Sequence, residues 1–144
     1  MNTSDYYYSD KAMMMTIKAP MKSVDACVLG TKNYIFTVPV KSMGVYGLVT
    51  TFKNHQYFQD MSVDEGLRKL ISEAESVEAL EDSLCALLED DDKYVYKLDE
   101  MNSFKFRGIF GRHTLRMARS KMHWASISFK KSPPSKEFRQ FYGQ

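Results

Sequence analysis

The stretch FKFRGIFGRHTLRMARSKMHWASISF, residues 104–129, decides the fold class because its side chains alternate. Residues 104–107 alternate an aromatic ring with a cation, so both rings point to one side of a strand and both cations to the other. Residues 114–117 and 124–129 read as two further strands, joined by a hairpin at Ser120 and Lys121. The stretch therefore predicts neighbouring antiparallel strands.

The N-terminal half also has strand character. Residues 26–29 form a short apolar run that a turn-rich tetrad closes, and residues 34–38 are dense in β-branched and aromatic side chains. Pro39 cannot donate a ladder hydrogen bond, so this second strand ends there or lies at an edge. Residues 48–52 predict another strand after a bulge at Gly47, and residues 94–98 one more.

The middle of the chain predicts two helices, or one bent helix, with a leucine face and an acidic face. Ser62 and Glu65 have the spacing of a capping box, and Ser76 is a candidate second N-cap. The acidic run at residues 89–92 ends the pattern, since acids are unfavourable at a helix C-terminus. A short C-terminal helix is predicted from Ser135, with aromatic residues facing the core.

These patterns predict one α+β domain over residues 19–144. Its expected architecture is a mostly antiparallel bent sheet of six or seven strands, an inserted acidic helical pair and a short C-terminal helix. Residues 1–18 are expected to form a flexible tail. Neither a secretory leader nor a membrane span is visible, so a cytoplasmic location is expected. Cys27 and Cys85 form no CxxC pair and are expected to be buried thiols rather than a disulfide.

Charge is strongly segregated along the chain, although its net value is only +2. Residues 60–101 carry fourteen acids against four bases, a net charge of −10, and residues 102–144 carry ten bases against one acid, a net charge of +9. Such segregation indicates either attraction between elements of the molecule or a charged surface for a partner. Composition leaves both open.

The basic third supplies the candidate binding residues. We expect cations on and between consecutive strands to bind phosphate or carboxylate groups of a protein partner or an anionic surface. These residues are Lys105, Arg107, Arg112, Arg116 and Arg119. A second, acidic docking face is expected on the helices at Glu73, Glu78, Glu81 and Asp82.

Two other functional classes stay open. A nucleic-acid-binding protein would use the same cations together with exposed Phe104, Phe106 and Trp124 as stacking platforms. A small enzyme without a recognisable motif is the other class, for which Glu100, His113 and His123 are the nearest candidates. The histidines and cysteines have no metal-ligand spacing and no cofactor motif is visible, so neither a metal nor a cofactor is expected.

About half of the chain resembles the bacterial pleckstrin-homology-like domains. The resemblance is carried by ACVLGTKNYIFTVPV at residues 26–40, by the Leu-Asp-Glu-Met step at residues 98–101, by the glycine-punctuated strands after it, and by a closing helix bearing phenylalanine. It implies a strongly bent sheet that a C-terminal helix caps at one end, with residues 62–89 as an insertion between strands. Members of that fold bind lipids, peptides or other proteins, so the resemblance alone implies no single ligand.

Overall fold

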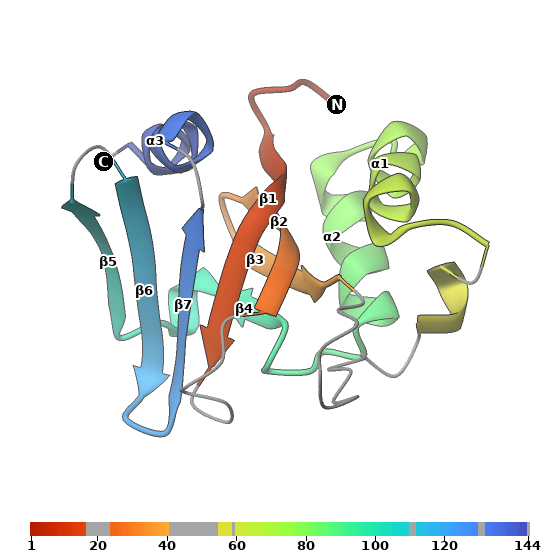
Figure 1. The fold of residues 1–144 in the computed structure, drawn as a ribbon. Coiled ribbons are helices and arrows are strands. Elements are labelled where there is room, and N and C mark those ends of the chain that lie inside the picture. The colour runs from red at the N-terminus through yellow and green to blue at the C-terminus, as the bar shows by residue number, and fades with distance from the viewer. Residues whose placement is uncertain (17–23, 41–54, 59, 110–111, 130–131, 144) are drawn as a thin grey trace, which may run out of the picture.

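The computed structural model describes residues 1–16, 24–40, 55–58, 60–109, 112–129 and 132–143 (Figure 1). Its strands are β1 (Tyr6–Thr16), β2 (Val24–Thr31), β3 (Tyr34–Pro39), β4 (Val95–Lys97), β5 (Ser103–Ile109), β6 (Arg112–Ser120) and β7 (His123–Phe129). Its helices are α1 (Val63–Glu73), α2 (Val77–Leu87) and α3 (Ser132–Phe141), with short 3₁₀ helices η1 (His55–Phe58) and η2 (Leu98–Glu100). The predicted α+β class is confirmed.

All seven strands form one antiparallel open sheet in the order β4-β3-β2-β1-β7-β6-β5. Two meanders, β1 to β4 and β5 to β7, therefore meet where β1 pairs with β7. The helical pair is inserted between strands, as the sequence predicts, and the described strands before and after it are β3 and β4. The strand predicted at residues 48–52, with its bulge at Gly47, lies outside the described residues.

The N-terminal segment is the main correction to the sequence analysis. A flexible tail over residues 1–18 is wrong for Tyr6–Thr16, because β1 is the central strand and pairs with both β2 and β7. Its register shifts between Ser9 and Ala12, beside the polar residues Asp10 and Lys11. This irregularity interrupts the two-residue alternation by which a half-buried strand is recognised.

The sheet has a hydrophobic core on each side. On one side α1 and α2 place Leu67, Leu80 and Leu84 against β2 and β3, and these leucines are at most 1% exposed. On the other side Phe138 of α3 packs with Leu115 and Ile127 of β6 and β7. The middle of β2 is buried throughout because it lies between the two cores, which explains its unbroken apolar run.

Both predicted helix caps of the inserted pair are present. The Ser62 hydroxyl accepts a hydrogen bond from the Glu65 amide at 3.1 Å while the Glu65 carboxylate accepts one from the Ser62 amide. The Ser76 hydroxyl accepts from the Ala79 amide at 3.1 Å. These serines fix where α1 and α2 begin.

The C-terminal helix starts earlier than predicted. Ser135 is not its cap, since α3 begins at Ser132 and Ser135 is fully buried within it. Pro133 and Pro134 lie in the first turn, where proline is tolerated because the amide groups there have no partner within the helix. The predicted role of the helix is confirmed, because Phe138 is 1% exposed and packs against the sheet.

Candidate functional site

The outer face of β5 and β6 carries three of the predicted binding residues. Strand alternation directs Lys105, Arg107 and Arg116 away from the core, and all three side chains are exposed. The strand register places Lys105 directly opposite Arg116, and Arg107 opposite Thr114. We call the surface formed by Lys105, Arg107 and Arg116 the basic face.

No carboxylate neutralises the basic face within the described part of the chain. The ion pairs there involve Lys11, Arg68, Lys93, Arg119 and His123, and none involves the three cations of the basic face. The Arg116 guanidinium instead lies 5.2 Å from the centroid of the Trp124 ring, close enough for a cation–π interaction. The face therefore presents positive charge on a rigid sheet.

The aromatic residues of β5 point the other way. Phe104 contacts Tyr142 with ring centroids 5.3 Å apart, and Phe106 contacts Phe138 at 5.6 Å. Both phenylalanine rings are partly buried and belong to the core beneath α3. The predicted alternation along residues 104–107 is thus confirmed, and its rings serve packing.

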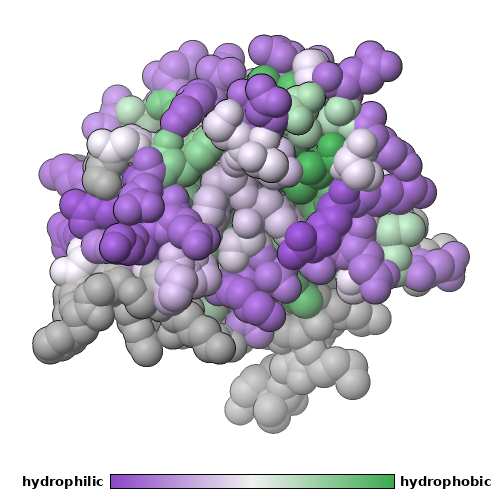
Figure 2. Space-filling model, turned by 90° about the horizontal axis from the view of Figure 1, so that it is seen from above, coloured by the Kyte–Doolittle hydropathy of each residue, from purple (hydrophilic) through white to green (hydrophobic). Residues whose placement is uncertain are grey.

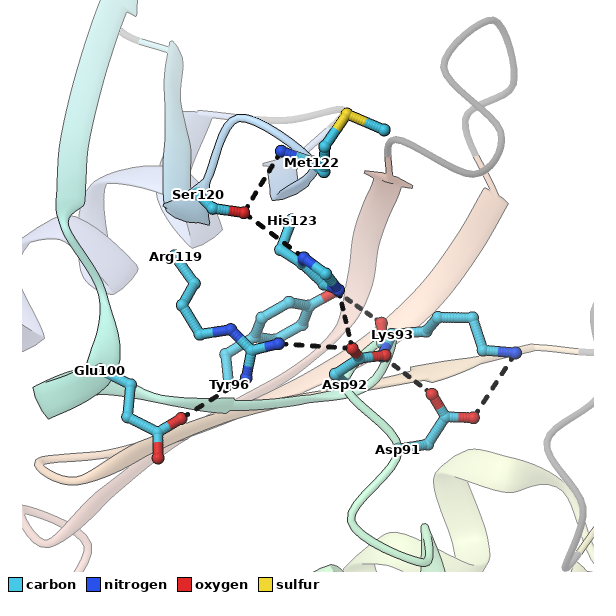
Figure 3. Close-up of polar contacts among 9 residues, drawn as sticks. All are labelled: Asp91, Asp92, Lys93, Tyr96, Glu100, Arg119, Ser120, Met122 and His123. Atoms are coloured by element: carbon cyan, nitrogen blue, oxygen red, sulfur yellow. Dashed lines mark hydrogen bonds and ion pairs between the residues drawn. The ribbon is translucent and has the colours of Figure 1, made fainter.

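Arg119 does not belong to the basic face, contrary to the sequence prediction. Its guanidinium reaches the Asp92 carboxylate at 3.5 Å and the Glu100 carboxylate at 3.7 Å, as Figure 3 shows. Alternation from the buried Leu115 and Met117 already places Arg119 on the inner side of β6. At this position the segregated charges attract one another within the molecule.

Arg112 is a backbone member of β6, where it pairs with Ile109, but its side chain lies outside the described part of the structure. Its predicted role in binding therefore stays a prediction.

The predicted acidic docking face does not include Glu81 as an exposed residue, and its role in docking stays a prediction. Glu81 is 6% exposed and accepts a hydrogen bond from the Asn33 side-chain amide at 3.3 Å, so it ties α2 to the turn between β2 and β3. Glu73, Glu78 and Asp82 are exposed. The leucine stripe of α2 does not reveal the burial of Glu81, because its partner comes from a distant turn.

A charged cavity of about 320 Å³ lies where β4 and η2 approach the hairpin between β6 and β7. Asp92 lines it, and its carboxylate lies 3.1 Å from the His123 Nε2 atom and 3.5 Å from the Arg119 guanidinium (Figure 3). Glu100 and Tyr96 also line it. These contacts connect the residues around β4, at one edge of the sheet, to β6 and β7 through side chains.

The same cavity tests the residues predicted for an enzyme. Glu100 and His123 both line it, whereas His113 lies at the opposite end of β6 and contacts the Arg139 guanidinium of α3 at 3.1 Å. The predicted trio is therefore not assembled.

A chain of contacts does run from Asp92 through His123 to the Ser120 hydroxyl, with 3.4 Å between Ser120 Oγ and His123 Nδ1. Ser120 Oγ also accepts from the Met122 amide, as in a tight turn, and Ser120 is exposed. It thus lacks the water-excluding surroundings of a productive serine nucleophile.

The two cysteines are free thiols in unreactive surroundings. Burial, the largest cause, raises the pKa of Cys27 to about 11. Burial, followed by the nearby Asp90 carboxylate, raises the pKa of Cys85 to about 11 as well. The thiolate that nucleophilic catalysis requires is therefore suppressed at neutral pH.

A broader hollow of about 670 Å³ lies at the end of the molecule seen in Figure 2, between the start of β1, α1 and Glu137 of α3. The Tyr7 hydroxyl donates to the Pro134 carbonyl at 2.8 Å, and the Tyr8 hydroxyl donates to the Asp64 carboxylate at 2.6 Å. These hydrogen bonds attach β1 to α3 and to α1. We therefore interpret the hollow as the place where these three elements pack together.

The described residues show neither a metal-ligand cluster nor a membrane-spanning helix, and comparison of the chain with known proteins found no match. The described residues contain no group of three or more potential metal ligands. Among the described helices, none combines the length and the apolar character needed to cross a membrane. Comparison with protein-family models, curated proteins and solved structures found no match for this chain.

Proposed function

We propose that the protein is a non-enzymatic interaction module whose basic face binds an anionic partner, namely a protein carrying an acidic segment. One observation carries the proposal: Lys105, Arg107 and Arg116 are exposed and share one face without a carboxylate partner among the described residues. Like charges this close repel one another, so an anionic ligand gains from all three at once.

A pleckstrin-homology-like architecture is part of this proposal. An antiparallel seven-stranded sheet and a C-terminal helix packed on β1, β6 and β7 support it. The ligand class nevertheless follows from the basic face, because a fold hosts many functions. The free thiols support a reducing compartment such as the cytoplasm.

The nucleic-acid alternative has less support. Phe104 and Phe106 pack beneath α3, so their rings are engaged in the core, and Trp124 is the one of the three aromatic candidates that contacts the basic face. Base stacking normally needs exposed rings along the binding strand.

The test is charge reversal on the basic face. Binding of a fluorescein-labelled glutamate decamer is measured by anisotropy for the native protein and for Lys105→Glu/Arg107→Glu. We expect the affinity to fall by about tenfold or more, with an unchanged melting temperature, because both side chains are exposed. The matched control Lys69→Glu/Lys136→Glu reverses two exposed lysines on α1 and α3 and should leave binding nearly unchanged.

Equal losses in both double variants would contradict the proposal, since they would indicate attraction by net charge alone. Two further probes, single-stranded DNA and phosphatidylserine vesicles, identify the ligand class. If either binds through the basic face more tightly than the acidic peptide does, the partner is not an acidic protein.

A further inference from the structure

Among the strands that the structure describes, β5 forms an open edge of the sheet. It pairs with β6 along its whole length without a register shift, and the strand order ends with it. The opposite edge strand, β4, is only three residues long. Natural proteins protect edge strands by shortness, bulges, proline or charge, and of these β5 has only its charges, Lys105 and Arg107. In Figure 1 no described segment lies beyond it.

The backbone hydrogen bonds show which groups of β5 point to the open edge. The Ala118 carbonyl accepts from the Asn102 amide at 2.8 Å, so Ala118 faces β5. Alternation then directs the backbone groups of Arg116 toward β5 as well, and those of its partner Lys105 toward β6. The intervening residues Phe104, Phe106 and Gly108 therefore direct their amide and carbonyl groups outward.

The register of the rest of the sheet gives the same result. On the far side the Val40 amide donates to the Asp25 carbonyl and the Thr37 amide donates to the Tyr94 carbonyl, both at 2.9 Å. Backbone groups of successive residues point to alternate sides of a strand, so these bonds fix the directions in β2 and, through the strand pairings, in β1, β7 and β6. By this second route too, the backbone groups of Arg116 point toward β5.

The side chains beside this edge differ on its two sides. Lys105 and Arg107 flank it on the outer side, and the partly buried rings of Phe104, Phe106 and Tyr142 flank it on the inner side. A strand added to β5 would thus meet cations with one set of alternate side chains and aromatic surface with the other. A second copy of β5 would instead bring like charges together, which disfavours self-pairing.

We propose that β5 accepts an extended segment of the partner protein, with alternating acidic and apolar residues, as an additional strand. This inference rests on the proposed function and specifies the conformation and sequence pattern of the partner. The backbone groups of Phe104, Phe106 and Gly108 supply the hydrogen bonds, and the basic face selects the acidic side chains.

The discriminating variant is Gly108→Pro. Gly108 is exposed and its amide points to the open edge, so proline removes one hydrogen bond to an added strand and projects its ring there, while the ladder to β6 is kept. Gly108→Ala is the matched control, because it retains the amide. The probe is a labelled nine-residue peptide of alternating glutamate and valine, measured by anisotropy against the native protein and both variants.

We expect Gly108→Pro to weaken peptide binding about tenfold or more and Gly108→Ala to change it less than about twofold. Circular dichroism melts check that both variants remain folded. If Gly108→Pro is unfolded, hydrogen exchange of the native protein decides instead, since an added strand must slow exchange of the Phe104 and Phe106 amides.

Three outcomes overturn the inference. If Gly108→Pro binds like the native protein while Lys105→Glu/Arg107→Glu does not, the basic face binds anions without strand addition and the proposed function survives. If the alternating peptide does not bind the native protein while the glutamate decamer does, strand addition fails and the proposed function survives. If neither variant weakens binding, or neither peptide binds the native protein, both proposals fail.

Discussion

Arg116 and Arg119 lie three positions apart on β6, and their surroundings are opposite. Arg116 is exposed and stacks on Trp124, whereas Arg119 pairs with Asp92 and Glu100. Position on the strand decides this difference, since alternation turns one outward and the other inward. Lys105 and Arg107 are likewise exposed because they lie at outward-facing positions of β5.

The two arginines give a matched pair of single substitutions. We expect Arg116→Ala to weaken binding of the glutamate decamer severalfold, and Arg119→Ala to leave it nearly unchanged, because Arg119 is already neutralised. Arg119→Ala should lower stability by less than about 1 kcal/mol, since its ion pairs are partly exposed. Anisotropy titrations and urea melts measure the two quantities. A larger loss of binding for Arg119→Ala would place the ligand in the cavity near Asp92.

The cysteines make a pH-dependent prediction. Burial raises the pKa of both thiols from 9.0 to about 11, so the unfolded chain loses these protons first as pH rises. The contribution of these thiols to stability should therefore be fully present below pH 9 and be lost between pH 9 and 11.

The raised pKa of Cys85 also predicts slow alkylation. At pH 8 its reaction with iodoacetamide should be about 100-fold slower in the folded protein than in urea, because the thiolate fraction is lower. Mass spectrometry measures the alkylation rate, and equal rates in the folded and unfolded protein would contradict a raised pKa of Cys85.

Among the secondary-structure elements, those with a continuous local pattern were predictable. The strands β2, β3 and β7 follow from apolar runs or alternation, and α1 and α2 follow from serine caps and leucine spacing. β1 was missed because Ser9, Asp10 and Lys11 interrupt its alternation at the register shift. Local sequence does not show that β1 pairs with β7, which lies more than a hundred residues further along the chain.

The residues of the candidate site likewise fall into those that local sequence predicts and those that depend on distant contacts. Lys105, Arg107 and Arg116 could be predicted because strand alternation is a local property. Glu81 could not, since its burial depends on Asn33 from a turn far along the chain. The cluster of Asp92 with Arg119 and His123 was also missed, although alternation already indicates that Arg119 and His123 share the inward side with their buried neighbours.

The junction of α1 with η1 depends on a glycine. A Cβ atom at Gly66 would lie 2.1 Å from ring carbons of the buried Phe58, so the ring must move to admit it. We expect Gly66→Ala to lower stability by about 1–3 kcal/mol, although alanine favours a helix. Ser72→Ala, an exposed site on the same helix, should change it by less than about 0.5 kcal/mol. Urea melts compare them, and a stabilised Gly66→Ala would refute this packing.

At the scale of the whole molecule, the segregated charges have two uses. Asp92 and Glu100, from the acidic stretch, neutralise Arg119 from the basic stretch and connect β4 and η2 to the hairpin of β6 and β7. The basic face is left without such partners among the described residues. Internal attraction and a surface for a partner therefore coexist, on opposite sides of the same strands.

The most direct measurement is a two-dimensional ¹⁵N NMR titration of the native protein with the glutamate decamer in low salt. Amide shifts should change most along Ser103–Ile109 and around Arg116, and the changes should diminish as salt is added, since the contact is electrostatic. Shift changes confined to the cavity around Asp92 or to α1 and α2, with β5 unaffected, would contradict a binding role for the basic face.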